Sequence, residues 1–145
     1  MFRDRITVLL QFVKKVFYEH DISILDLGIN KTQINILMFI DENKEKSMSE
    51  ISCMTGLEKS SFTRSVDYLV DNGFITRNSP QNDRRKITLS LTAKGNKITK
   101  LIRNDFDAYL ESLITDFSEE EKDDFFQSLA VVSKYMNKIL ERKKR

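Results

Sequence analysis

The sequence predicts a mainly α-helical fold with one small β-hairpin of two or three strands. Only four glycines and one proline occur in 145 residues, so few positions interrupt a helix. Apolar residues recur at every third or fourth position along most of the chain, which is the spacing of a helix face. The alternation that is typical of strands occurs in one stretch, residues 74–91.

The N-terminal part of the chain is predicted to hold two helices. Apolar residues step by three or four along residues 2–19 and predict the first helix. After a break at residues 21–28, Asn30 is followed three positions later by Gln33, a capping-box pattern that predicts the start of the second helix. The polar residues 41–46 are expected to form a connector after it.

Two further helices are predicted in the middle of the chain. Ser47 and Glu50 form a second capping-box pattern and predict a short helix as far as Met54, which a Thr-Gly turn follows. The next helix is predicted over Lys59–Asp71. Gly73 comes just after it, where a left-handed residue commonly ends a helix.

The hairpin is predicted in the stretch that follows. Apolar and polar residues alternate in residues 75–77 and again in residues 87–91, which predicts two short strands. Between them lies the segment NSPQNDRR, residues 78–85. Its turn-forming residues predict a polar loop.

Two long helices are predicted to complete the chain. Thr92 is expected to cap the first, whose apolar face covers residues 98–114. Ser118 and Glu121 form a third capping-box pattern. The apolar stripe over residues 125–139 predicts the last helix.

The composition is that of a soluble, charge-rich globular protein. Apolar residues make up 40% of the chain and charged residues 32%, which excludes the disordered and membrane-protein classes. Gln11, Lys14 and Lys15 interrupt the N-terminal apolar residues, so these match neither a signal peptide nor a membrane span. We therefore expect a cytoplasmic protein with no membrane partner.

The net charge of +2 is unevenly distributed along the chain. Residues 1–46 carry seven basic and seven acidic side chains, residues 47–100 carry nine and five, and residues 101–145 carry eight and ten. The positive excess therefore lies in the middle of the chain, as expected for a DNA-contacting segment between two scaffold elements. Chance variation of a solvated surface is the alternative explanation.

The predicted order of helix, turn, helix and hairpin in residues 47–91 is that of a winged helix-turn-helix. In that fold the second helix reads DNA in the major groove. Helical spacing turns Phe62, Val66 and Leu69 inward and leaves outside Lys59, Ser60, Ser61, Thr63, Arg64, Asp67 and Tyr68. Short hydroxyl side chains followed by an arginine let a helix approach the bases closely, although an ordinary solvated face would show the same pattern.

The hairpin and the residues after it carry a family pattern. The segment DRRKITLSLT matches the pattern DxRxxxxxLT through Asp83, Arg85, Leu91 and Thr92, and it continues as AKG. Upstream, SFTRSVDYLVDNGFITR at residues 61–77 has the Thr-Arg pair, the Val-Asp pair and the glycine of the same family. In these motifs the chain resembles the MarR (multiple antibiotic resistance regulator) family of winged helix-turn-helix transcriptional regulators.

The resemblance implies DNA contacts from the second helix and from the hairpin, or wing. The implied DNA-binding residues are Lys59, Ser60, Ser61, Thr63, Arg64, Arg84, Arg85 and Lys86. Arg85 would enter the minor groove from the tip of the wing, and Asp83 would hold the shape of the wing. The family often has a small residue where this chain has Glu58, whose carboxylate suits the helix dipole but repels phosphate.

The resemblance also implies a homodimer. On this interpretation residues 1–145 are a single domain, in which residues 1–29 and 115–145 form dimerisation helices and residues 30–100 bind double-stranded DNA. The family pattern implies a repressor that a small molecule, often a phenolic compound, releases from a pseudo-palindromic operator. The alternative is a winged-helix module without effector sensing, which acts as a constitutive DNA-binding or protein-interaction factor. The ligand-binding residues are unknown.

No metal, cofactor or catalytic site is predicted. His20 lies between two acidic residues at a helix end, where a surface group that complements the helix dipole is a simpler interpretation than a metal ligand. Cys53 is the only cysteine, and a structural thiol is a simpler interpretation than a redox sensor. A phosphate-binding glycine loop and an HExxH motif are both absent from the sequence, so an enzyme has no support.

Overall fold

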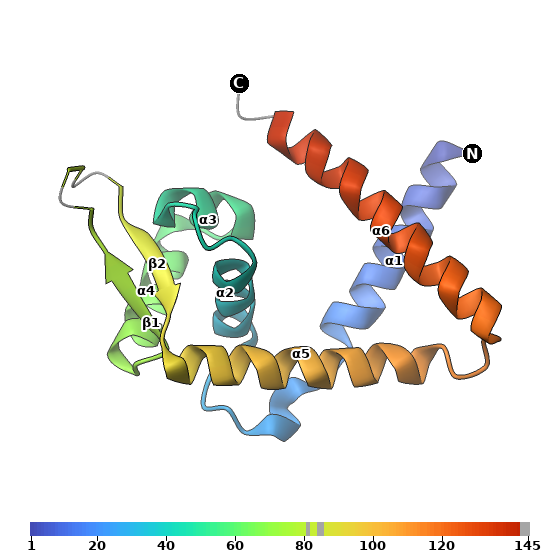
Figure 1. Ribbon diagram of the computed structural model, residues 1–145, viewed down its shortest axis with the longest axis horizontal. Coiled ribbons are helices and arrows are strands. Elements are labelled where there is room, and N and C mark those ends of the chain that lie inside the picture. The colour runs from blue at the N-terminus through green and yellow to red at the C-terminus, as the bar shows by residue number, and fades with distance from the viewer. Residues whose placement is uncertain (81, 84–85, 143–145) are drawn as a thin grey trace. The chain divides into compact units, whose positions relative to one another are not determined.

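The computed structural model describes residues 1–80, 82–83 and 86–142 (Figure 1). The chain divides into two compact units, Met1–Asp107 and Ala108–Arg145. In chain order the elements are α1 (Phe2–Tyr18), the 3₁₀ helix η1 (Ile22–Leu25), α2 (Lys31–Glu42), α3 (Met48–Thr55), α4 (Lys59–Asp71), β1 (Ile75–Asn78), β2 (Thr88–Leu91), α5 (Ala93–Leu113) and α6 (Glu119–Arg142). The mainly helical fold with one small hairpin is confirmed.

Reciprocal side-chain caps begin α2 and α3. Oδ1 of Asn30 accepts the backbone N–H of Gln33 at 2.9 Å, and Oε1 of Gln33 accepts that of Asn30 at 2.9 Å. Ser47 and Glu50 make the same pair of hydrogen bonds at 3.2 and 2.8 Å. Each pair satisfies two N–H groups that a helix start leaves without partners. Both predicted capping boxes are confirmed.

Left-handed glycines follow the two helices in the middle of the chain. Gly56 ends α3 with a φ of 66°, and Gly73 follows α4 with a φ of 74°. A residue with a Cβ is strained at these angles, so glycine is the residue that lets the chain turn there. The predicted bounds of α4 are confirmed at both ends.

The core of the Met1–Asp107 unit lies where α2, α3 and α4 meet the hairpin. Its buried side chains are Ile36, Leu37, Ile40, Ile51, Phe62, Val66, Leu69, Phe74, Ile75 and Leu89. Phe62, Val66 and Leu69 form the inner face of α4, as predicted, and none is more than 1% exposed. Burying a large apolar side chain contributes about 1.5–3 kcal/mol. This face therefore holds α4 with its opposite face in solvent.

The hairpin is a two-stranded antiparallel sheet. Its pairing runs from Ile75 opposite Leu91 to Asn78 opposite Thr88. One isolated bridge between Ser47 and Thr88 adds a short third segment beside β2. The prediction of two or three strands is therefore confirmed.

Thr92 connects α4, the hairpin and α5. Its hydroxyl donates to the carbonyl oxygen of Gly73 at 2.6 Å and accepts the N–H of Gly95 at 3.1 Å. Its backbone N–H donates to the carbonyl oxygen of Phe74 at 3.0 Å. The predicted capping role of Thr92 is confirmed, and the same side chain also fixes where α5 begins relative to the end of α4.

Lys94 of α5 contacts the end of α4 and the residue that precedes β1. Its Nζ donates to the carbonyl oxygen of Asn72 at 2.8 Å and lies 4.2 Å from the centroid of the Phe74 ring. The carbonyls at a helix C-terminus are partly negative, so an ammonium group stabilises the end of α4 there. The AKG that follows the wing thus has a structural role at this junction.

Helix α2 is longer than the sequence predicts. The expected connector begins at residue 41, but α2 continues through Glu42. Asp41 has a side chain only 14% exposed and forms an ion pair with Arg103 of α5. The helix dipole disfavours an acidic residue in a last turn. The ion pair offsets that effect, and the start of the predicted connector was wrong for this reason.

The Ala108–Arg145 unit contains the end of α5 and the whole of α6. Ser118 and Glu121 form the predicted capping box, with hydrogen bonds of 3.2 and 2.7 Å. None of the residues of α6 is buried. Over the described ranges, the helices are either too short or too polar to cross a membrane.

Candidate nucleic-acid interface

The exposed face of α4 carries residues that the sequence assigns to DNA reading. Lys59, Ser60 and Arg64 are exposed, whereas Ser61 and Thr63 are half-buried. The hydroxyl of Thr63 donates to the carbonyl oxygen of Lys59 at 2.8 Å. Its oxygen remains able to accept a further hydrogen bond. The face thus combines two cations with three small hydroxyl groups at one end of a helix.

Glu58 lies at the start of this face. It is the N-cap residue of α4, it is exposed, and its side chain makes no cap hydrogen bond. The positive end of the helix favours a carboxylate at this position. The same carboxylate would repel a phosphate that approached the first turn of α4. This repulsion is the effect expected where the chain has Glu58 and the family often has a small residue.

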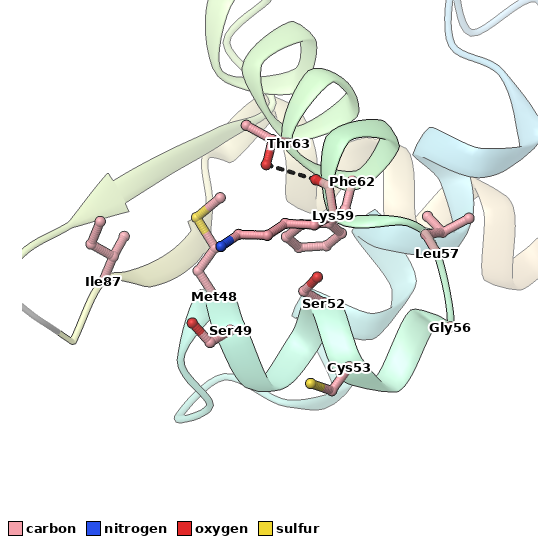
Figure 2. Close-up of a pocket in the computed structure, with 10 residues that line it drawn as sticks. All are labelled: Met48, Ser49, Ser52, Cys53, Gly56, Leu57, Lys59, Phe62, Thr63 and Ile87. Atoms are coloured by element: carbon pink, nitrogen blue, oxygen red, sulfur yellow. Dashed lines mark hydrogen bonds between the residues drawn. The ribbon is translucent and has the colours of Figure 1, made fainter.

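A pocket of about 510 Å³ lies beside the N-terminal end of α4 (Figure 2). It is lined by Met48, Ser49, Ser52, Cys53, Gly56, Leu57, Lys59, Phe62, Thr63 and Ile87. Figure 2 shows that these residues come from α3, from the turn that follows it, from the start of α4 and from the residue before β2. Cys53 is exposed there. The surface in front of α4 is therefore concave, with the thiol in its lining.

The wing loop carries the second group of predicted DNA contacts. The N–H of Asp83 donates to the carbonyl oxygen of Pro80 at 3.2 Å, and the N–H of Lys86 donates to that of Asp83 at 3.2 Å. Asp83 and Lys86 are both exposed. The predicted contacts at Arg84 and Arg85 lie outside the described residues, so their roles stay predictions from the sequence.

Sequence reasoning missed an ion pair that joins the wing to α4. Nη2 of Arg77 in β1 contacts Oδ1 of Asp67 in α4. One signal was present in the sequence, because Arg77 follows the apolar Ile75 by two positions. Residues two apart on a strand share a face. The Arg77 side chain is therefore expected on the strand face that also holds the buried Ile75.

The hydroxyl of Tyr68 is also engaged within the fold. The sequence places this residue on the exposed face of α4, and its side chain is 39% exposed. Its hydroxyl nevertheless donates to the carbonyl oxygen of Gly28 at 2.8 Å. Tyr68 thus links α4 to the segment that precedes α2.

His20 is not the surface group that the sequence suggests. Its side chain is 13% exposed, and Nε2 lies 2.6 Å from Oδ2 of Asp105 in α5. The ring also meets Phe106 edge-on, with centroids 6.2 Å apart. The expectation was wrong because α5 covers the end of α1. Within the described part of the chain, no group of three His, Cys, Asp or Glu side chains could hold a metal ion.

Helices α3 and α4 followed by the hairpin define a winged helix-turn-helix protein. A sequence model of the MarR family matches residues 27–86, from the segment before α2 to the wing loop. Residues 27–86 of the chain therefore belong to the MarR family by this match.

Two relatives are named as transcriptional repressors. The chain is 33% identical to the transcriptional repressor MprA of Escherichia coli K12 over 102 residues, which are 69% of this chain and 58% of that protein. It is 28% identical to the HTH-type transcriptional repressor YetL of Bacillus subtilis 168 over 105 residues, which are 70% of this chain and 62% of that protein. The match thus spans less than two thirds of the length of either relative.

A solved structure has the same fold. Wild-type MarR from Escherichia coli, in its apo form, matches with a TM-score of 0.69 and 22% sequence identity. The match covers 89% of this chain and 93% of that chain. The likeness therefore extends well beyond the winged helix-turn-helix to most of the chain.

Proposed function

We propose that this chain is a sequence-specific DNA-binding transcriptional regulator that acts as a homodimer on a pseudo-palindromic operator and represses the genes it controls. The observation that carries the proposal is the exposed face of α4, where Lys59, Ser60 and Arg64 lie in solvent. The names of the relatives MprA and YetL support the repressor role. In this proposal the chain catalyses no reaction and acts in the cytoplasm.

In the proposed complex α4 lies in the major groove. The groove is about 12 Å wide and admits one helix. Arg64 would donate two hydrogen bonds to a guanine edge, since the planar guanidinium matches the two acceptors of that base. Lys59 would contact a phosphate, and the small side chains of Ser60, Ser61 and Thr63 would let the helix approach the base edges.

The wing supplies the second contact of the proposed complex. Arg85 would enter the minor groove, where a narrow A·T-rich segment concentrates negative potential. Arg84 and Lys86 would contact phosphates on either side. The Asp83 side chain would hold the shape of the loop, in which the N–H and carbonyl of this residue also form backbone hydrogen bonds.

Exposed apolar side chains on α1 and α6 support the proposed dimer. On α1 they are Phe2, Ile6, Val8, Leu10, Val13, Phe17 and Tyr18, and on α6 they are Phe126, Val131, Val132, Tyr135, Met136, Ile139 and Leu140. Apolar surfaces of this extent mark sites of protein contact. A two-fold dimer would bury them against the same surfaces of a second copy. We assign dimerisation to residues 1–29 and 115–145 and DNA binding to residues 30–100.

A second pocket supports a ligand response. It measures about 430 Å³ and is lined by Asp21, Ile22, Asp26, Leu27, Gly28, Ile29, Asn30, Lys31 and Ile34. Volumes of this size suit small molecules. The carbonyl oxygen of Gly28, a residue of the pocket lining, accepts a hydrogen bond from the hydroxyl of Tyr68 on α4. This hydrogen bond would connect a ligand in the pocket to α4. We propose that a small aromatic effector, such as a phenolic compound, binds at this pocket and weakens DNA binding.

The alternative is a regulator that binds DNA without sensing an effector. A thermal-shift screen against phenolic acids, dyes and metal ions separates the two functions. A compound that raises the melting temperature and lowers DNA affinity supports the ligand-responsive repressor. If every compound leaves both unchanged, the constitutive module is favoured.

Selection from random-sequence duplex DNA tests the proposed function itself. We expect one enriched inverted repeat, with half-site centres about 34–36 Å apart or a multiple of that spacing. Its affinity should fall steeply with salt, because bound phosphates release counterions. A chain that enriches no sequence, and shows no salt-dependent retention on DNA, would contradict the proposal.

A further inference from the structure

The wing leaves the protein core soon after its first residue. Ile75 of β1 is 1% exposed, but residues 76–78 are exposed. On β2, Leu89 is 1% exposed and Thr88 is half-buried. Core packing therefore fixes the base of the hairpin. It does not fix the direction of the strand ends that lead into the wing loop.

An ion pair fixes the outer part of β1. Arg77 lies on the same strand face as Ile75, and its Nη2 contacts Oδ1 of Asp67. Asp67 directly follows Val66, which is fully buried, so the core holds the backbone at the helix end of the pair. The two side chains are 34% and 51% exposed. A pair this exposed adds little to global stability, but it links the outer part of the strand directly to α4.

A second link fixes β2 from the other side. Thr88 forms its isolated bridge with Ser47, and the N–H of Met48 donates to the carbonyl oxygen of Ile87 at 2.8 Å. The hairpin is thus tied to α4 through one strand and to the start of α3 through the other. Without the contact at Arg77, the position of the outer part of β1 would depend on its pairing with β2.

Asp67 is otherwise hard to reconcile with a DNA-reading helix. It lies one helical turn after Arg64, and a free carboxylate there would repel phosphate. Contact with the guanidinium of Arg77 offsets that charge.

We propose that Asp67 and Arg77 are positioning residues for sequence-specific DNA binding. Their ion pair sets the spacing between α4 and the wing, so that both elements enter neighbouring grooves of one duplex. The inference rests on the DNA-binding function proposed above. At the specific site a tilted wing loses contacts, because groove spacing is fixed by the duplex. Random DNA, which is held mainly through phosphates, loses little.

The test compares two duplexes by fluorescence anisotropy. One is the duplex that the wild-type protein selects from random DNA, and the other is a scrambled duplex of equal length. Asp67→Asn and Arg77→Gln should each lower affinity for the selected duplex by about 5- to 10-fold. Affinity of Asp67→Asn for the scrambled duplex should stay equal or rise, because a negative charge is lost. The double variant should lose no more than either single variant.

Asp71→Asn is the matched control, since it removes the same charge one turn further along α4. Its affinity for the selected duplex should not fall, and all variants should melt at the wild-type temperature. The inference is overturned if Asp67→Asn binds the selected duplex as tightly as wild type. It is also overturned if the single losses add in the double variant, or if they follow a fall in melting temperature. A wild-type chain that selects no duplex would instead overturn the proposed function, and this inference with it.

Discussion

A Cβ atom at Gly95 would lie 2.1 Å from the carbonyl oxygen of Phe74. The first turn of α5 therefore packs directly on the backbone that follows α4. That oxygen cannot move aside easily, because it also accepts the N–H of Thr92 at 3.0 Å. Glycine at position 95 is thus a packing requirement of the junction between the wing and α5.

Gly95→Ala is expected to lower the free energy of unfolding. Forcing an extra methyl group into a packed site costs about 1–3 kcal/mol. Alanine favours a helix over glycine by up to about 1 kcal/mol, so this gain offsets only part of the clash. Urea denaturation measures the difference. Asn96→Ala, at the exposed neighbouring position, is the control and should not destabilise. A Gly95→Ala protein more stable than wild type would contradict the close packing.

Arg64→Ala should weaken binding to the selected duplex more than binding to random DNA. A bidentate arginine contact to a base contributes about 1–3 kcal/mol of discrimination. Titrating both duplexes at one salt concentration gives the two affinities. Arg142→Ala removes an exposed arginine near the end of α6 and should change neither. Equal losses on both duplexes would make Arg64 a phosphate contact.

Arg85→Ala should lower affinity for the selected duplex and reduce the salt slope of binding by about one unit. Dimerisation and melting temperature should stay at their wild-type values. Arg85→Lys should recover part of the loss, because an ammonium group is more strongly hydrated than a guanidinium and enters the groove at greater cost. A salt titration over a tenfold range of concentration measures the slope.

Asp83→Ala is the companion test of the wing. It should weaken DNA binding although it removes a negative charge, because the Asp83 carboxylate is expected to hold the shape of the wing. If Asp83→Ala binds more tightly while Arg85→Ala binds normally, the wing does not read the minor groove. The roles assigned to these two residues would then be wrong.

Ile139→Asp should convert the proposed dimer into monomers. Ile139 is 62% exposed on α6, so an aspartate there costs little in a monomer. Burying an unpaired carboxylate in a dimer interface costs several kcal/mol, which raises the dissociation constant at least about 100-fold. Sedimentation at micromolar concentration measures the shift. Asn137→Asp places the same charge on a polar position of α6 and should leave the dimer intact. A wild-type chain that sediments as a folded, DNA-binding monomer would contradict the assignment.

Elements whose signals are local could be predicted from the sequence. Asn30 and Gln33 lie three positions apart and make their capping box within one helical turn. The inner face of α4 was likewise predictable, because helical spacing alone separates Phe62 and Val66 from Arg64. The candidate interface on α4 follows from the same periodicity.

Contacts between distant segments left no comparable signal. His20 and Asp105 are 85 positions apart, and their contact depends on how α5 passes the end of α1. The two further residues of α2, Asp41 and Glu42, depend on the contact with Arg103 in the same way. For the pair of Asp67 and Arg77 the sequence indicates which face of the strand holds Arg77, but the packing of β1 against α4 decides whether the two side chains meet.

The exposed thiol of Cys53 makes the chain suitable for site-specific labelling. Cys53 is the only cysteine in the sequence, it is exposed, and it lines the pocket that also contains Lys59 and Thr63. A maleimide dye attached there would lie at the edge of the α4 surface without any other cysteine having to be removed. Exclusion of water by a bound duplex would change its emission, so one covalent fluorophore would report association in real time.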